Sequence, residues 1–129
     1  MYLTGDEKPV RFIPALQRIS IVCLVATVST MAEPSAIVTL SIDGECHTCQ
    51  KKGDGCVDAV FTTINACFPN NVELEHYEVQ AANPGSKALA KVKVSVSLMG
   101  RSITAEAENA DTIIASAHAY IEALNQLHS

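Results

Sequence analysis

Apolar and polar residues alternate along several stretches of this chain, as they do in strands with one buried face. The clearest alternation lies in residues 87–99, where lysines and serines alternate with valines and Leu98. The face of that strand with the lysines and serines should be exposed to solvent. The predicted strands cover residues 17–28, 35–43, 45–50, 72–82, 87–99 and the stretch after Gly100 as far as 107.

Two other stretches have helical spacing of apolar residues. A helix is predicted over residues 55–68, and Pro69-Asn70-Asn71 ends it. A second is predicted over residues 111–127. Each has a single apolar stripe, which indicates packing on a core. The stripes consist of Val57, Val60, Phe61, Ile64 and Phe68 in the first helix, and of Ile113, Ala117, Tyr120, Leu124 and Leu127 in the second.

Turn residues separate the strands. Asp43-Gly44 favours a two-residue hairpin turn, and Asn83-Pro84-Gly85-Ser86 is typical of a longer turn. We therefore expect antiparallel strands on either side of each.

The strand, turn, strand, helix order occurs twice. A shift of 56 positions takes Val38 to Val94 and aligns residues 38–67 with residues 94–123 without a gap. Few residues are identical, and amphipathic patterning alone can make unrelated units look alike. We nevertheless interpret the match as a repeat. The expected fold is α+β, with two pseudo-repeated β-hairpin-plus-helix units that form an antiparallel sheet with both helices packed on one face. A partner chain is the simplest cover for the remaining surface, so the chain should dimerise.

Composition narrows the function classes. The chain has 129 residues, a net charge of −5 and no tryptophan, and its few basic residues are scattered. Nucleic-acid binding needs clustered lysine and arginine, so it is not expected.

The N-terminal region allows two interpretations. Residues 1–32 resemble a secretory signal, with an apolar run from Ile19 to Val28, but that run reads equally well as a buried strand. The run is too short to cross a bilayer. We favour the strand, and with it a cytoplasmic protein that has no membrane contact. One domain is expected at residues 16–129, after an N-terminal extension over residues 1–15 whose order or disorder the sequence leaves open.

Five cysteines do not suit a fully paired disulfide framework. Cys46 and Cys49, with Cys56 nearby, resemble half of a zinc site, but no second pair completes it. On a strand, Cys46 and Cys49 would also point to opposite faces. No metal or cofactor is therefore expected, and a zinc or redox module remains the less favoured alternative. Cys23 and Cys67 should behave as small apolar residues.

Residues 51–59 place two glycines and two aspartates where a strand pattern changes to a helical one. The first N–H groups of a helix have no partner within the helix and carry the positive end of its dipole, so they can bind a carboxylate or phosphate. Gly53 and Gly55 would let a ligand approach the backbone. Asp54 or Asp58 could bind the cationic end of a zwitterion, or could simply cap the helix.

Several short motifs together resemble the C-terminal regulatory domain of 2-isopropylmalate synthase. The resemblance covers residues 16–127, and the order and spacing of the motifs carry it. They are Gly53-Asp54-Gly55, Val57-Asp58-Ala59, Tyr77-Glu78-Val79, Ala88-Leu89-Ala90, Asp111, Ala115-Ser116-Ala117-His118-Ala119-Tyr120 and Ala123-Leu124-Asn125. The chain departs from the family pattern at Cys56, where proline is usual, and at His76, Lys87 and Ala107, which puts the identity of the effector in doubt.

The resemblance implies a homodimer that binds leucine at the dimer interface as a feedback inhibitor of leucine biosynthesis; related citramalate synthases bind isoleucine there. Main-chain amides would hold the carboxylate of the effector, and small apolar side chains would enclose its branched end. The implied effector-binding residues are Gly53, Asp54, Gly55, Val57, Asp58, Leu74, Tyr77, Ala81, Ala90, Ala110, Asp111 and Thr112.

The catalytic part of that family is a (β/α)₈ barrel with a metal-binding His-x-His motif, and this chain contains no such motif. A barrel needs about 250 residues. We therefore expect no catalysis by this chain, and a barrel either in the same longer protein or in a separate one. The alternative is a structural dimerisation domain without an effector.

Overall fold

The computed structural model describes residues 18–81 and 89–127. They form two consecutive units of three strands and one helix. The first unit contains β1 (Ile19–Thr27), β2 (Ser35–Ile42), β3 (Glu45–Lys52) and α2 (Cys56–Cys67). The second contains β4 (Glu73–Ala81), β5 (Ala90–Leu98), β6 (Arg101–Asn109) and α3 (Thr112–Leu127).

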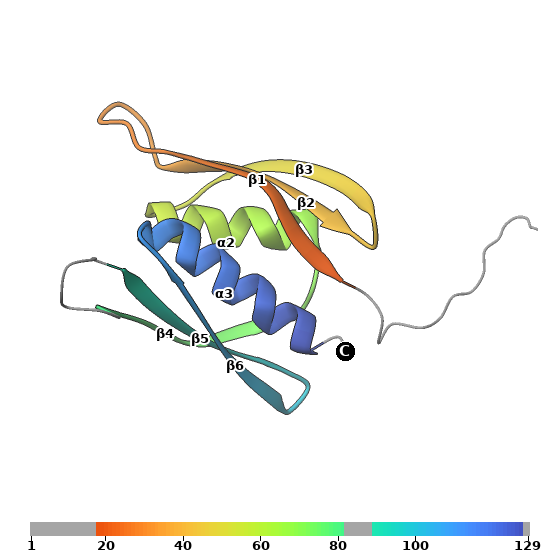
Figure 1. Cartoon of the computed structure of the whole chain (residues 1–129). Coiled ribbons are helices and arrows are strands. Elements are labelled where there is room, and N and C mark those ends of the chain that lie inside the picture. The colour runs from red at the N-terminus through yellow and green to blue at the C-terminus, as the bar shows by residue number, and fades with distance from the viewer. Residues whose placement is uncertain (1–17, 82–88, 128–129) are drawn as a thin grey trace, which may run out of the picture.

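Each unit makes its own antiparallel three-stranded sheet, in the orders β1-β2-β3 and β4-β5-β6. The two helices lie side by side between the sheets, so the described residues form three layers (Figure 1). Each sheet has the helices on one face only. The structure thus confirms the α+β class and the repeated units, and adds that the strands divide into two sheets.

The core consists of the inner faces of the two sheets and the facing stripes of the helices. Val38 and Leu40 of β2, and Val92, Val94 and Val96 of β5, are fully buried. In both strands the alternate residues face outward, as the period of two requires. Ala115, Ala117, Ala119 and Ala123 let α3 approach its neighbours closely.

The internal repeat extends to single interactions. Asp43-Gly44 and Met99-Gly100 are both hairpin turns with two positive φ angles, 53° and 89° in the first turn, 52° and 83° in the second. The side chains of Thr39 and Thr48 are hydrogen-bonded at 2.7 Å on the outer face of the first sheet, and those of Ser95 and Thr104 at 2.8 Å on the second. The same shift of 56 positions relates all of these pairs, so the repeat is structural and not only a matter of composition.

The predicted elements agree with the observed ones to within three residues at each end. The apolar run forms β1 from Ile19 to Thr27, so the strand interpretation is confirmed, but the strand is not buried on both faces, since Val22 and Val25 are 57% and 47% exposed. The predicted turn at residues 83–86 and the N-terminal extension at residues 1–15 lie outside the described residues. In the described part of the chain, neither helix is long and apolar enough to span a membrane.

The two units differ in how well their first strand is covered. Asn125 near the end of α3 binds both the N–H and the carbonyl of Ile19, at 2.8 and 2.9 Å, and holds β1 against the helix. Helix α2 has 12 residues against 16 in α3, so it has no counterpart of Asn125. At the start of β4, Leu74 is 47% exposed, whereas Ile19 is 2% exposed. Strand β4 therefore presents part of its apolar inner face to solvent.

Candidate functional site

The turn before α2 is built on a close backbone contact at Gly53. Its N–H donates to the carbonyl of Pro34 at 3.0 Å, which fastens the turn to the β1–β2 connection. A Cβ atom on this residue would lie 2.5 Å from the backbone nitrogen of Ala59 and 2.7 Å from an oxygen of Asp58. Only glycine fits there, because backbone atoms cannot move aside as a flexible side chain can.

The first turn of α2 has open backbone donors. Gly55 is the N-cap residue, and it has no side chain to accept a hydrogen bond. Within the described ranges 18–81 and 89–127, the N–H groups of residues 55–58 have no hydrogen-bond acceptor. Asp58 binds the N–H of Asp54 at 2.9 Å, outside the helix, and so leaves those donors open. These amides and the helix dipole favour an anion.

The N–H groups at the start of α3 are hydrogen-bonded to side chains that lie just before the helix. Asp111 accepts hydrogen bonds from the N–H groups of Ile113 and Ile114, at 2.8 and 3.1 Å. Asn109 accepts from the N–H of Asp111 at 2.8 Å. This is ordinary N-terminal capping. Of the two helix starts that the sequence singles out, the one at Ala110–Thr112 thus has its N–H groups at Asp111, Ile113 and Ile114 occupied.

Most of the predicted site residues lie at one end of the molecule. Both helices begin there, and β4 ends and β5 begins there, with Ala81 paired to Ala90 (Figure 1). The side chain of Ala81 lies outside the described part. Leu74 lies near the opposite end of β4, about 23 Å away along the strand. The structure therefore places both helix starts and Ala90 at one end of the molecule, and Leu74 toward the other end.

Tyr77 sits midway along β4 and connects three elements. Its ring meets the ring of Phe61 of α2 edge-on, with centroids 5.9 Å apart. Its hydroxyl is 2.7 Å from the hydroxyl of Ser116 of α3. Ser116 gives its one proton to the carbonyl of Thr112 at 2.8 Å, so Tyr77 must be the donor in their bond. Tyr77 thus fixes the position of β4 relative to both helices.

Val79 is a candidate that the sequence analysis did not place in the site. It pairs with the fully buried Val92 and faces the inner side of the sheet, yet it is 44% exposed. Alternation alone assigns Val79 to the core. Its exposure arises because β4 is an edge strand that α2 covers incompletely, which no local pattern reveals. An apolar group near the open start of α2 could bind there.

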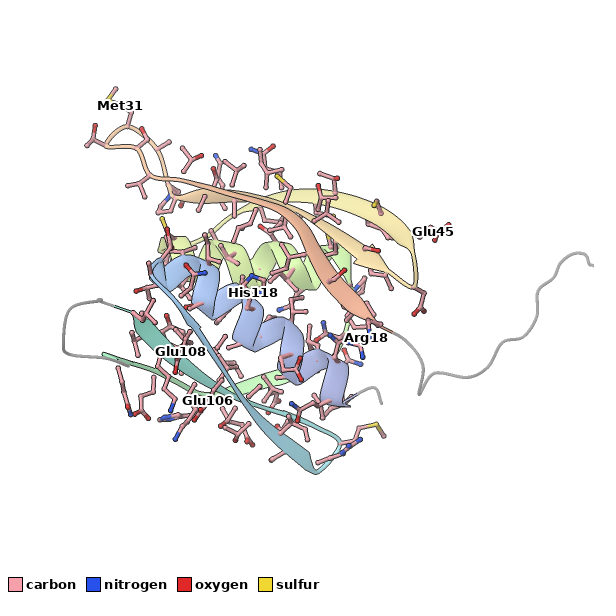
Figure 2. The ribbon with its side chains drawn as sticks, viewed as in Figure 1. Arg18, Met31, Glu45, Glu106, Glu108 and His118 are labelled. Atoms are coloured by element: carbon pink, nitrogen blue, oxygen red, sulfur yellow. The ribbon has the colours of Figure 1, made fainter. Side chains whose placement is uncertain are left out.

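A groove with a volume of about 610 Å³ lies elsewhere, between β6 and α3. Its lining is Thr104–Ala107, His118, Glu122 and Gln126. Figure 2 shows His118 on the side of α3 that faces out between β1 and β6, and Glu106 on β6. This lining has two carboxylates and, unlike the start of α2, no helix N-terminus to bind the carboxylate of an amino acid, so this groove does not suit the predicted effector.

The cysteines do not assemble a metal site. Cys46 pairs with Ser41 and is exposed, whereas Cys49 pairs with the buried Val38 and faces the core, so the two point to opposite faces as predicted. In the described residues, no cluster of three or more His, Cys, Asp or Glu side chains could hold a metal ion.

Comparison with known proteins matches residues 10–128 to the model of the LeuA allosteric (dimerisation) domain. This chain belongs to that family. It is 41% identical over 110 residues to the 2-isopropylmalate synthase of Rhodopseudomonas palustris strain BisA53, a match that covers 85% of this chain and 21% of the relative. To the 2-isopropylmalate synthase of Bradyrhizobium sp. strain ORS 278 it is 41% identical over 115 residues, which cover 89% of this chain and 22% of the relative.

A third relative, the 2-isopropylmalate synthase of Afipia carboxidovorans, is 38% identical over 112 residues, 87% of this chain and 22% of the relative. The chain thus spans about a fifth of the length of the curated relatives it matches. The similarity confirms the resemblance stated above for residues 16–127, and with it the assignment to an allosteric, dimerising domain.

Proposed function

We propose that this domain binds a free branched-chain amino acid, leucine or isoleucine, at the start of α2, and thereby regulates a 2-isopropylmalate synthase-type barrel in the same longer protein or in a separate one. The chain itself regulates and does not catalyse. Family membership supports the regulatory role, and the open N–H donors at residues 55–58 support the start of α2 as the binding position.

The charges around the start of α2 suit a zwitterion. The open N–H groups would take the carboxylate of the amino acid, as a helix N-terminus takes other anions. The carboxylates of Asp54 and Asp58 lie on the same turn, and both side chains are exposed. They would take the ammonium group. A free amino acid carries both charges on groups attached to its Cα, whereas a residue within a peptide carries neither of these charges.

The apolar part of the ligand needs a surface beside these charges. Val79 and Ala90 supply one at the end of the molecule where α2 begins, and Val57 is half-buried on the first turn of α2. A branched chain that covers Val79 would remove its exposed apolar area from water, which is favourable. Leucine, isoleucine and valine differ by a methylene or by a branch point, a difference worth about 1–3 kcal/mol in an apolar pocket.

One observation favours this function over a purely structural one. In the two repeats, the helix starts are equivalent, yet Asp111 caps α3 and Gly55 leaves α2 uncapped. A domain that only dimerises gains nothing from an uncapped helix, because a capping side chain stabilises the fold. The structural alternative predicts a stable dimer that no amino acid stabilises further.

A thermal-shift screen over the twenty amino acids, followed by calorimetric titration, tests the proposal. Leucine or isoleucine should raise the melting temperature, since a ligand that binds only the folded state stabilises it. L-leucinamide, which lacks the carboxylate, should not bind. If no amino acid shifts the melting temperature, the structural alternative holds. If leucine and leucinamide bind equally, the carboxylate does not lie on the α2 amides.

A further inference from the structure

Two cysteines approach each other where α2 ends against the first sheet. Cys67 is the last residue of α2, and its thiol is 3.5 Å from the carbonyl of Val38 and 3.6 Å from that of His47. Those carbonyls belong to β2 and β3. Cys49 of β3 is paired with Val38 and follows His47 by two residues, with its side chain on the same inner face of the sheet. The two thiols therefore occupy one layer between β3 and α2.

The two thiols interact with each other. Burial raises the pKa of the Cys67 thiol to about 12, and a hydrogen bond and electrostatic interaction with the Cys49 thiol contribute to the rise. Cys49 is partly exposed, whereas Cys67 is buried. A reagent from solution can thus reach Cys49 more readily than Cys67.

We propose that Cys49 and Cys67 form a reversible disulfide that joins β3 to the end of α2 when a low-molecular-weight disulfide, such as glutathione disulfide, is present. The thiolate of Cys49 attacks one sulfur of the reagent, breaks its S–S bond and releases one small thiolate. Cys67 then gives up its proton and attacks the Cys49 sulfur, which expels the second small thiolate. Two protein thiols are oxidised, and one reagent disulfide is reduced to two thiols.

The second step should be slow, since Cys67 holds its proton at neutral pH and the thiolate is the nucleophile. A mixed disulfide at Cys49 should therefore accumulate first. Two other cysteines serve as internal controls. Cys23 and Cys46 are exposed on the outer side of the first sheet, and nothing places another thiol beside them among the described residues.

Peptide mapping of the whole chain after oxidation tests the proposal. The folded protein is incubated with glutathione disulfide, its remaining thiols are alkylated under denaturing conditions, and its peptides are identified by mass spectrometry. A Cys49–Cys67 peptide pair that dithiothreitol reverses is the expected result. Cys49→Ser should abolish the pair, Cys67→Ser should stop the reaction at the mixed disulfide, and Cys46→Ser, on the same strand, should leave the pair intact.

The same reaction in urea separates the folded geometry from simple thiol reactivity. Unfolded protein should give a mixture of pairings in which Cys49–Cys67 is not enriched. The proposal is overturned if folded protein yields only mixed disulfides at exposed cysteines, or if the Cys49–Cys67 pair forms in equal proportion with and without urea. Neither outcome depends on whether the domain binds an amino acid.

Discussion

Gly55 and Asp111 occupy equivalent positions in the two repeats, and only Asp111 caps its helix. The shift of 56 positions that superimposes the hairpin turns also takes Gly55 to Asp111. Asp111 occupies the N–H groups of Ile113 and Ile114, whereas those of residues 55–58 have no acceptor in the part of the chain that the structure describes. The start of α3 is capped by a side chain of the same protein, whereas the N–H groups at the start of α2 remain open to a ligand.

Replacing Gly55 by aspartate should cap the start of α2 in the same way. A Cβ at this position meets nothing within 4 Å, and the backbone is extended, with φ at −147°. The new carboxylate should therefore cap α2 as Asp111 caps α3 and repel the effector carboxylate. Calorimetry with leucine should show no binding, while urea unfolding should show stability unchanged or raised by a few tenths of a kcal/mol.

Gly55→Ala is the matched control for that variant, since it adds a side chain without an acceptor or a charge. It should cost about 0.5–1 kcal/mol of stability and weaken binding much less than aspartate does. Equal affinity for leucine in the wild type and in Gly55→Asp would refute the placement of the carboxylate.

Gly53→Ala should destabilise the fold although it is two residues from Gly55. Its Cβ would overlap backbone atoms of Ala59, at 2.5 and 2.7 Å, so the turn must move. A loss of about 1–3 kcal/mol is expected from such overpacking. Urea unfolding measures it, and a loss below that of Gly55→Ala would show that the turn can adjust without cost.

Tyr77→Phe should weaken the connection between β4 and α3 while the aromatic contact with Phe61 remains. The lost hydrogen bond to Ser116 is expected to cost about 0.5–1.5 kcal/mol. A double-mutant cycle with Ser116→Ala should give a coupling energy of similar size. Strict additivity of the two losses would mean that the bond contributes nothing to stability.

Val79→Ala should reduce effector affinity about 5- to 10-fold, because part of a Val side chain would no longer be covered by the ligand. Its stability cost should be small, since Val79 is already 44% exposed. Val25→Ala is the matched control, a valine 47% exposed on the outer side of the first sheet. Titration of both variants with leucine should show a loss only in the first, and a similar loss in both would remove Val79 from the site.

The sequence predicts the elements of this fold well and their assembly less completely. Alternation in β5 and the helical stripe of α3 follow from local geometry, and the Asp43-Gly44 turn from the positive φ angles that its residues tolerate. The division into two sheets does not follow, because alternation shows which face of a strand is buried but not which strand lies beside it. Here α2 separates β3 from β4, so these strands form no hairpin and each unit closes its own sheet.

The candidate site is predictable to a similar extent. Glycines and aspartates at residues 53–58 mark the start of α2 from sequence alone. The exposure of Val79 does not appear in the sequence, since it depends on how far α2 covers the edge strand β4. Leu74 fits the resemblance but lies far from the helix starts along β4. Tertiary contacts, and not local sequence patterns, determine the exposure of Val79 and the position of Leu74 relative to the helix starts.

An NMR titration of ¹⁵N-labelled protein with leucine and with isoleucine tests the central claim most directly, because it observes the amides themselves. Saturable shifts of the amide signals of residues 55–58 are expected, with the signals of Ile113 and Ile114 much less affected because Asp111 already holds those groups. Saturable binding with the largest shifts at Ile113 and Ile114, and none at residues 55–58, would contradict the account.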